Sequence, residues 1–125
     1  MKNIYDLIPK EKLDIVSNSI EKAHGLPNEC YLDSEYTTIE RKKIFEDKWV
    51  VVGVASSLPN PGDAKPFELL GIPLIILRDS LNNIKVFHNV CSHRGYKLLN
   101  EPCNINKVLR CPYHSWSYDL KGNLI

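Results

Sequence analysis

The sequence predicts a mainly β protein, a small antiparallel β barrel or sandwich that follows an N-terminal helical segment. Three features support this. Apolar residues recur at helical spacing before residue 48, and short β-branched runs separated by turn residues follow from there. The chain of 125 residues is also long enough for one core of ordinary size. We therefore expect a helical lead at residues 1–47 and a β domain at residues 48–125.

The first helix of the lead is expected within residues 10–23. Leu13, Val16 and Ile20 repeat there at three- and four-residue spacing, the period of one apolar helix face. Gly25 follows shortly afterwards, as glycine commonly does where a helix has ended. We therefore expect a short amphipathic helix with a defined stop.

A second helix is expected from Asp33-Ser34, which offers an N-cap, to about Asp47. One side of this helix would carry Tyr36, Ile39, Glu40 and Lys43. Its basic residues are Arg41, Lys42, Lys43 and Lys48. Such a run is most often a solvated face, and the more specific interpretation is a docking edge for an acidic protein partner.

From Trp49 onward the pattern is that of strands. Strands are expected at residues 49–54, 67–70, 73–78, 84–88, 108–110 and 115–118, and turns at residues 58–63 and 79–83. Each run is short, and Pro, Gly, Asn or Asp separates many of them. This spacing is typical of an antiparallel domain that presents functional residues on its loops.

Two Cys-His pairs carry the chemistry of the chain. One residue separates Cys91 from His93, and two residues separate Cys111 from His114. Two thiolates on one iron and two imidazoles on the other form a Rieske [2Fe–2S] centre, whose potential lies at about −150 to +300 mV. The sequence thus predicts that these four residues bind one such cluster.

The surrounding residues resemble the Rieske domain of aromatic-ring-hydroxylating oxygenase alpha subunits. Residues 91–95 match the pattern C-x-H-R-G, and residues 111–118 match C-P-Y-H-x-W-x-Y. Further matches are Ile44-Phe45, Trp49, Gly53, Leu58-Pro59, Pro61-Gly62-Asp63, Arg78-Asp79, Phe87-His88-Asn89-Val90 and Gly122. The resemblance covers about residues 30–125, and the chain is most similar to the branch that acts on quaternary amines such as choline or carnitine.

The resemblance implies a Rieske-type β fold and an electron-transfer role in an oxidoreductase. Electrons would come from a reductase or ferredoxin and pass to a mononuclear Fe(II), which hydroxylates a small organic substrate with dioxygen as a mono- or dioxygenase. That iron is expected in a second domain, on another chain or subunit of a homo-oligomer, a trimer by resemblance. We expect the last strands of the barrel and the catalytic iron domain to be missing from this chain, so no residue here is expected to be catalytic.

Two alternatives stay open. A stand-alone Rieske ferredoxin carrier would bind the same cluster, although the helical lead argues against it. A structural zinc module would also use two cysteines and two histidines, but zinc fingers usually group each residue type together, whereas each pair here is mixed. The respiratory type of Rieske protein is expected to have a disulfide between its loops. Tyr96 and Tyr113 stand at those positions, so that disulfide cannot form.

Composition and the remaining residues narrow the setting. Sixteen basic and fifteen acidic residues give no overall attraction to nucleic acid or to anionic membranes. The sequence has no apolar run of membrane-spanning length and does not begin like a signal peptide, and its few cysteines fit a reducing compartment, so we expect a cytoplasmic protein. Residues expected to be structural and not ligands are His24, Cys30, His88, Cys103, Trp116 and Tyr118.

Overall fold

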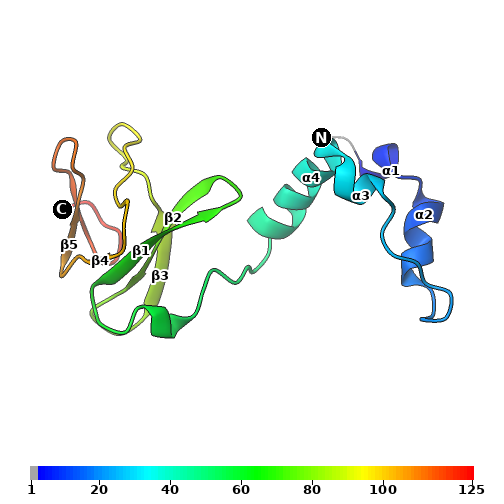
Figure 1. The fold of residues 1–125 in the computed structure, drawn as a ribbon. Helices are drawn as coiled ribbons and strands as arrows, with labels where there is room; N and C mark the ends of the chain where they lie inside the picture. Colours follow the sequence, from blue (N-terminus) through cyan, green and yellow to red (C-terminus); the bar gives the residue numbers. More distant parts are fainter. Residues whose placement is uncertain (1–2) are drawn as a thin grey trace. The chain divides into compact units, whose positions relative to one another are not determined.

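The computed structural model describes residues 3–125, which divide into two compact units at residues 50 and 51 (Figure 1). The first unit is helical, and the second contains the strands of the described chain. The mainly antiparallel β class with a helical lead is confirmed. The domain boundary at residues 47 and 48 stays a prediction. No helix within residues 3–125 is both long and apolar enough to cross a bilayer.

The helical unit consists of short segments around a small core. These are α1 (Ile4–Leu7), α2 (Lys10–Asp14), the 3-10 turn η1 (Ile15–Ser17), α3 (Glu29–Leu32), α4 (Ser34–Glu40) and the π-helical η2 (Arg41–Glu46). Ile8, Cys30 and Tyr36 form the buried centre of this unit. Because no segment is long enough to be stable alone, their packing on this centre holds the unit together.

The first predicted helix is shorter than expected. It ends at Ser17, and Ile20, which the helical spacing placed on the apolar face, is exposed. The backbone carbonyl of Ser19 instead accepts the N–H groups of Lys22 and Ala23, which form a separate turn after the helix.

The second predicted helix is confirmed, including its N-cap. The Asp33 carboxylate accepts the backbone N–H groups of Glu35 and Tyr36, at 2.7 and 3.1 Å. Tyr36 and Ile39 are buried, as their spacing predicts. Beyond Glu40 the helix widens to π-helical bonding and ends at Glu46.

The second unit is built from two antiparallel sheets. Its elements are η3 (Ala55–Ser57), β1 (Asp63–Leu69), β2 (Ile72–Arg78), β3 (Ile84–His88), β4 (Cys103–Asn104), β5 (Val108–Arg110) and β6 (Ser117–Asp119). The larger sheet has the order β3-β2-β1-β4, and β5 pairs with β6. A bridge from Tyr118 to Leu124 extends the smaller sheet after β6.

Most predicted strands are present, but residues 49–54 form none. Trp49 and Val51 in that segment are exposed, and a β-branched run becomes a strand only where neighbours provide pairing and packing. The strand at 115–118 begins only at Ser117, because Ser115 and Trp116 belong to the preceding loop. β4 was not predicted, since two residues carry too little periodicity to be recognised.

Two turns of the β unit, residues 79–83 and 119–123, share one hydrogen-bond pattern. In each, an Asp accepts the backbone N–H groups two and four residues later and also the side-chain amide of the Asn four residues later. The residue before that Asn is left-handed, at φ 66° for Asn82 and 88° for Gly122. Each Asp thereby fixes a reversal of the chain.

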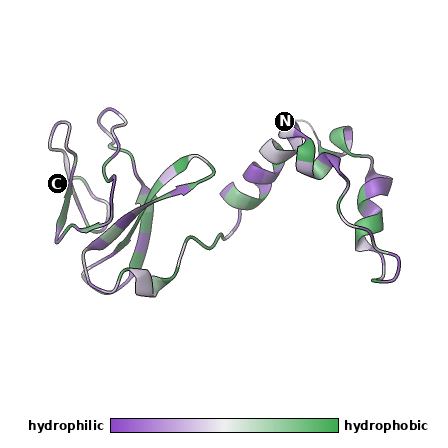
Figure 2. Cartoon of the chain, in the orientation of Figure 1, coloured by the Kyte–Doolittle hydropathy of each residue, from purple (hydrophilic) through white to green (hydrophobic). Residues whose placement is uncertain are grey.

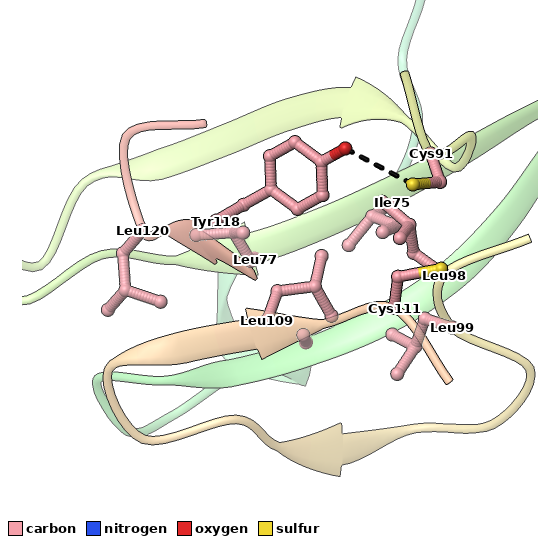
Figure 3. Packing of buried hydrophobic residues seen from close by; sticks show 10 residues of the cluster. Ile75, Leu77, Cys91, Leu98, Leu99, Leu109, Cys111, Tyr118 and Leu120 are labelled. Carbon is pink, nitrogen blue, oxygen red and sulfur yellow. Dashed lines mark hydrogen bonds between the residues drawn. The ribbon is translucent and has the colours of Figure 1, made fainter. Parts of the chain in front are cut away.

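The core of the β unit includes the two cysteines of the Cys-His pairs (Figure 3). Its buried members are Ala64, Ile75, Leu77, Cys91, Leu98, Leu99, Leu109, Cys111, Tyr118 and Leu120. The loop between β3 and β4, yellow in Figure 1, is largely hydrophilic in Figure 2. The motif residues therefore stand where an apolar core meets a polar loop.

Candidate metal centre

Two loops with the same internal hydrogen bonds carry the four predicted ligands. In each, the N–H of the cysteine donates to the carbonyl five residues later, and its carbonyl accepts the N–H four residues later. The bonds are Cys91 to Tyr96 at 2.8 Å, Gly95 to Cys91 at 2.9 Å, Cys111 to Trp116 at 2.8 Å and Ser115 to Cys111 at 2.9 Å. The two loops are therefore equivalent turns.

The fourth residue after each cysteine is left-handed. Gly95 has φ 71° and Ser115 has φ 61°. Glycine adopts this conformation freely, whereas serine does so at a cost of roughly 1 kcal/mol. Both turns thus reverse the chain at the same place, although His93 is the second residue after its cysteine and His114 is the third.

The sulfur atoms lie inside the unit and the imidazoles lie further out. Cys91 and Cys111 are each 2% exposed, His93 is half-buried and His114 is exposed. The two imidazole rings approach edge to face, with 4.9 Å between their centroids. The structure therefore brings the four predicted residues together, with thiols on one side and imidazoles on the other.

The surroundings of Cys91 favour its thiolate form. The Tyr118 hydroxyl lowers the pKa of the Cys91 thiol; burial acts in the opposite direction, and the backbone of His93, the Cys111 side chain and the backbone of Arg94 add to the lowering. A thiolate is the form of cysteine that binds metals. The thiol is therefore prepared for a ligand role without a charged partner.

The surroundings of His93 favour its neutral form. Burial lowers the pKa of the imidazole, and the positive charges of His114 and Arg94 lower it further. Neutral imidazole has a free nitrogen lone pair for a metal, whereas imidazolium has none. Trp116 also stacks on this ring, at 4.7 Å between centroids and 10° between planes, which limits its orientation.

Tyr118 contributes more than the packing that the sequence predicts. Its ring is buried, and its hydroxyl lies 3.3 Å from the sulfur of Cys91. The dashed line in Figure 3 marks this contact. The same oxygen accepts the backbone N–H of Ser92 at 3.1 Å and lies 2.9 Å from the Ser92 hydroxyl. The signal available in the sequence was chemical, since a tyrosine hydroxyl inside a core needs a polar partner.

The two loops also contact one another through aromatic rings. Tyr96 and Tyr113 lie 5.5 Å apart between centroids, and Tyr113 lies 3.8 Å from His114. The positions at which the respiratory type is expected to have its disulfide therefore carry a ring contact. None of the four cysteines, all of which are described, is in a disulfide; Cys30 is buried in the helical unit and Cys103 is exposed in β4.

The donor set suits a two-iron cluster. Within residues 3–125, no three His, Cys, Asp or Glu side chains gather around one ion position. A Rieske cluster takes only two protein ligands at each iron, so the pairs are the relevant units. Two buried thiols and two outer imidazoles match that requirement.

Comparison with known proteins identifies the family. The model of the Rieske [2Fe-2S] domain matches residues 48–125. Among curated proteins, the glycine betaine monooxygenase oxygenase subunit of Chromohalobacter salexigens is 36% identical over 82% of the chain. The carnitine monooxygenase oxygenase subunit of Escherichia coli K12 is 33% identical over 83%. The chain spans about a quarter of these relatives, 23% and 28% of their respective lengths.

Solved structures agree with this assignment. Naphthalene 1,2-dioxygenase from Rhodococcus sp. is similar over 99% of this chain and 27% of that protein's chain, with a TM-score of 0.82 and 29% identity. A quaternary ammonium Rieske monooxygenase in complex with L-carnitine is similar over 82% of this chain and 29% of that one, with a TM-score of 0.77 and 33% identity. With the two loops, the buried thiols and the match over residues 48–125, the chain belongs to the Rieske [2Fe–2S] domain family.

Proposed function

We propose that the chain is the electron-transfer part of a non-haem iron oxygenase alpha subunit in the cytoplasm. Cys91 and Cys111 would bind the inner iron of a [2Fe–2S] cluster, and His93 and His114 the outer iron. One observation carries this proposal: two equivalent loops present buried thiols and outer imidazoles to the same place. When bound, the cluster accepts and releases one electron at a time.

The residues of the chain prepare this centre in three ways. The core around Cys91 and Cys111 excludes water from the sulfur side. Neutral imidazoles add no negative charge to the outer iron, so its reduction is easier than with four thiolates. The Tyr118 hydroxyl can donate to the sulfur of Cys91 and withdraw negative charge from it. The exposed His114 side is the natural point of electron entry and exit.

The relatives support a proposal for the partners and the substrate. A reductase or ferredoxin would supply electrons to the cluster. The cluster would pass them to a mononuclear iron on another subunit of a homo-oligomer such as a trimer. The substrate we propose is a small organic molecule of the quaternary amine class. Supporting this are the names of the relatives, which specify glycine betaine and carnitine. Dioxygen-dependent hydroxylation of the substrate would take place at this mononuclear iron.

The cluster assignment can be tested on the purified chain. After anaerobic reconstitution, it should contain two irons and two acid-labile sulfides per chain and give a rhombic EPR signal on reduction with dithionite. A colourless protein with one zinc would contradict the assignment and favour the structural zinc module instead.

A stand-alone ferredoxin carrier is the alternative, and the helical unit bears on it. The similarity to the Rhodococcus dioxygenase covers 99% of the chain and so includes helical residues before position 48, which supports the oxygenase assignment. The chain should therefore raise hydroxylation by a separately produced catalytic iron domain when reductase and dioxygen are present. Rapid reduction of cytochrome c without any gain in hydroxylation would favour the carrier.

A further inference from the structure

The two cluster loops have the same tip but different bases. The second loop lies between β5 and β6, and the pairing of Arg110 with Ser117 closes its base. The first loop follows β3, which pairs with β2. Its other end, residues 98–99, lies in no strand. Strand pairing therefore closes the base of the second loop, whereas the base of the first loop must be closed by other contacts.

The side chain of Asn89 provides that closure. Its Oδ1 accepts the backbone N–H groups of Leu98 and Leu99, at 2.9 and 2.8 Å. Its Nδ2 donates to the carbonyl of Leu99 at 2.6 Å. One amide thus provides the donor and the acceptor that a neighbouring strand would offer.

The position of Asn89 is itself fixed. The residue is 1% exposed, and its backbone N–H donates to the carbonyl of Pro73 at the start of β2, at 2.8 Å. It stands two residues before Cys91, and Leu98 and Leu99 belong to the same core as that cysteine. The larger sheet, Asn89 and both ends of the first loop therefore form one connected unit.

We propose that Asn89 is the positioning residue for the Cys91–His93 half of the centre. It holds the ends of the first loop together, so that the sulfur of Cys91 stays beside Tyr118 and the imidazole of His93 stays against Trp116. The proposal rests on the proposed function, because it takes these two residues as ligands. It goes further because it assigns a role to a residue that binds no iron. It also implies that only the Cys91–His93 half of the centre depends on a side-chain amide for its position.

The chemistry of the amide explains why asparagine is required. An aspartate of the same shape accepts both N–H groups but cannot donate to the Leu99 carbonyl, and it places a buried negative charge against that oxygen. A serine is too short to reach both partners. Either change should loosen the first loop, whereas the second loop keeps the paired base formed by β5 and β6.

The test compares Asn89→Asp with Asp79→Asn in the full chain. Asp79 is also a buried polar residue that accepts two backbone N–H groups and one asparagine amide, but its turn lies at the end of β3 opposite the first loop. The measurements are thermal unfolding of the apo chain, the rate of cluster loss to a chelator, and pulsed-EPR couplings of the histidine nitrogens. We expect cluster loss from Asn89→Asp to be about tenfold faster than its lowered apo stability alone would account for. It should alter the coupling of only one of the two histidines, and Asp79→Asn should alter neither.

Equal cluster loss in both variants at equal loss of apo stability would overturn the proposal. Equal changes at both histidines in Asn89→Asp would do the same. If that variant does not fold, hydrogen exchange in apo Asn89→Ser decides. The amides of Leu98 and Leu99 should exchange faster while the amides of Cys111 and Ser115 keep their protection, and unchanged exchange would contradict the proposal. Because this arm needs no cluster, it remains informative if the wild-type chain binds zinc and the proposed function fails.

Discussion

At Cys91, burial and hydrogen bonding act on the same thiol in opposite directions. Burial alone raises the pKa of a thiol, yet the Tyr118 hydroxyl and backbone groups of the loop bring the pKa of Cys91 below its ordinary value. These donors carry no net charge. In the proposed centre, reduction is favoured by these dipoles and by neutral imidazoles, so single side chains should tune the reduction potential without changing the charge of the centre.

Replacement of Tyr118 by Phe tests this directly. The ring and its packing stay, and only the hydroxyl 3.3 Å from the sulfur is lost. We expect the reduction potential to fall by tens of millivolts, where about 59 mV corresponds to a tenfold change in a one-electron equilibrium. Protein-film voltammetry measures it, with Tyr31→Phe, an exposed tyrosine of the helical unit, as control. An unchanged potential would show that the hydroxyl holds Ser92 in place but does not tune the centre.

Replacement of His114 by Cys tests the ligand assignment. A third thiolate adds negative charge to the outer iron, so the cluster should remain while its potential moves toward the range of all-cysteine clusters, near −400 mV. His24→Cys is the matched control, since His24 is exposed in the helical unit and belongs to neither loop. Voltammetry and EPR on both variants provide the comparison. A shift in His24→Cys as large as in His114→Cys would refute the assignment.

At the scale of elements, the repeated Asp turns fix how the β unit closes on itself. The 119–123 turn brings Gly122 against Phe87 of β3, where a Cβ would lie 2.8 Å from the ring. The same glycine is left-handed. One residue of this turn therefore meets both a conformational and a steric requirement.

Gly122→Ala and Gly71→Ala separate these two requirements. Gly71 has nearly the same φ, 82° against 88°, but nothing lies within 4 Å of its added Cβ. Each alanine should cost about 1–2 kcal/mol for its left-handed conformation. Gly122→Ala should cost further free energy, because Phe87 must move. Urea unfolding of the apo variants measures both, and equal losses of stability would show that the ring yields freely.

The same scale shows what the sequence could predict. Helix α4 and strands β2, β3 and β5 follow from a cap, from periodicity and from turn residues, which are local signals. Residues 49–54 have the composition of a strand but lack a partner, and partners are not local. Tyr118 and Asn89 show the same limit within the centre, because their hydrogen bonds reach residues 26–27 and 9–10 positions away, respectively. The two Cys-His motifs could be recognised in the sequence because each is contained in one short loop, and their role as cluster ligands stays a prediction.

For the molecule as a whole, carboxylates that organise turns should set its tolerance of acid. Hydrogen bonds from Asn60 and Asn104 lower the pKa of Asp63. Burial pushes the pKa of Asp79 upward, but hydrogen bonds from Asn83 and Leu81 outweigh it and the pKa is lowered. Asn123 lowers the pKa of Asp119. All three groups are thus more acidic in the folded chain than their ordinary value of 3.8.

A carboxyl group whose pKa is lower in the folded than in the unfolded state stabilises the fold. This stabilisation is complete above the pKa of the unfolded state and is lost as pH falls through the pKa of the folded state. We therefore expect the free energy of unfolding of the apo chain to be constant from about pH 7 to 5 with respect to these groups, and to fall steadily below about pH 4. Asp119→Asn keeps the shape of the turn but removes one titrating group, so its stability should depend less steeply on pH below 4 than that of the wild type. Urea unfolding at a series of pH values measures both slopes. If the two slopes are parallel, the acid sensitivity comes from other groups. A carboxylate that its turn stabilises must lose that stabilisation when it is protonated, so its removal must change the slope.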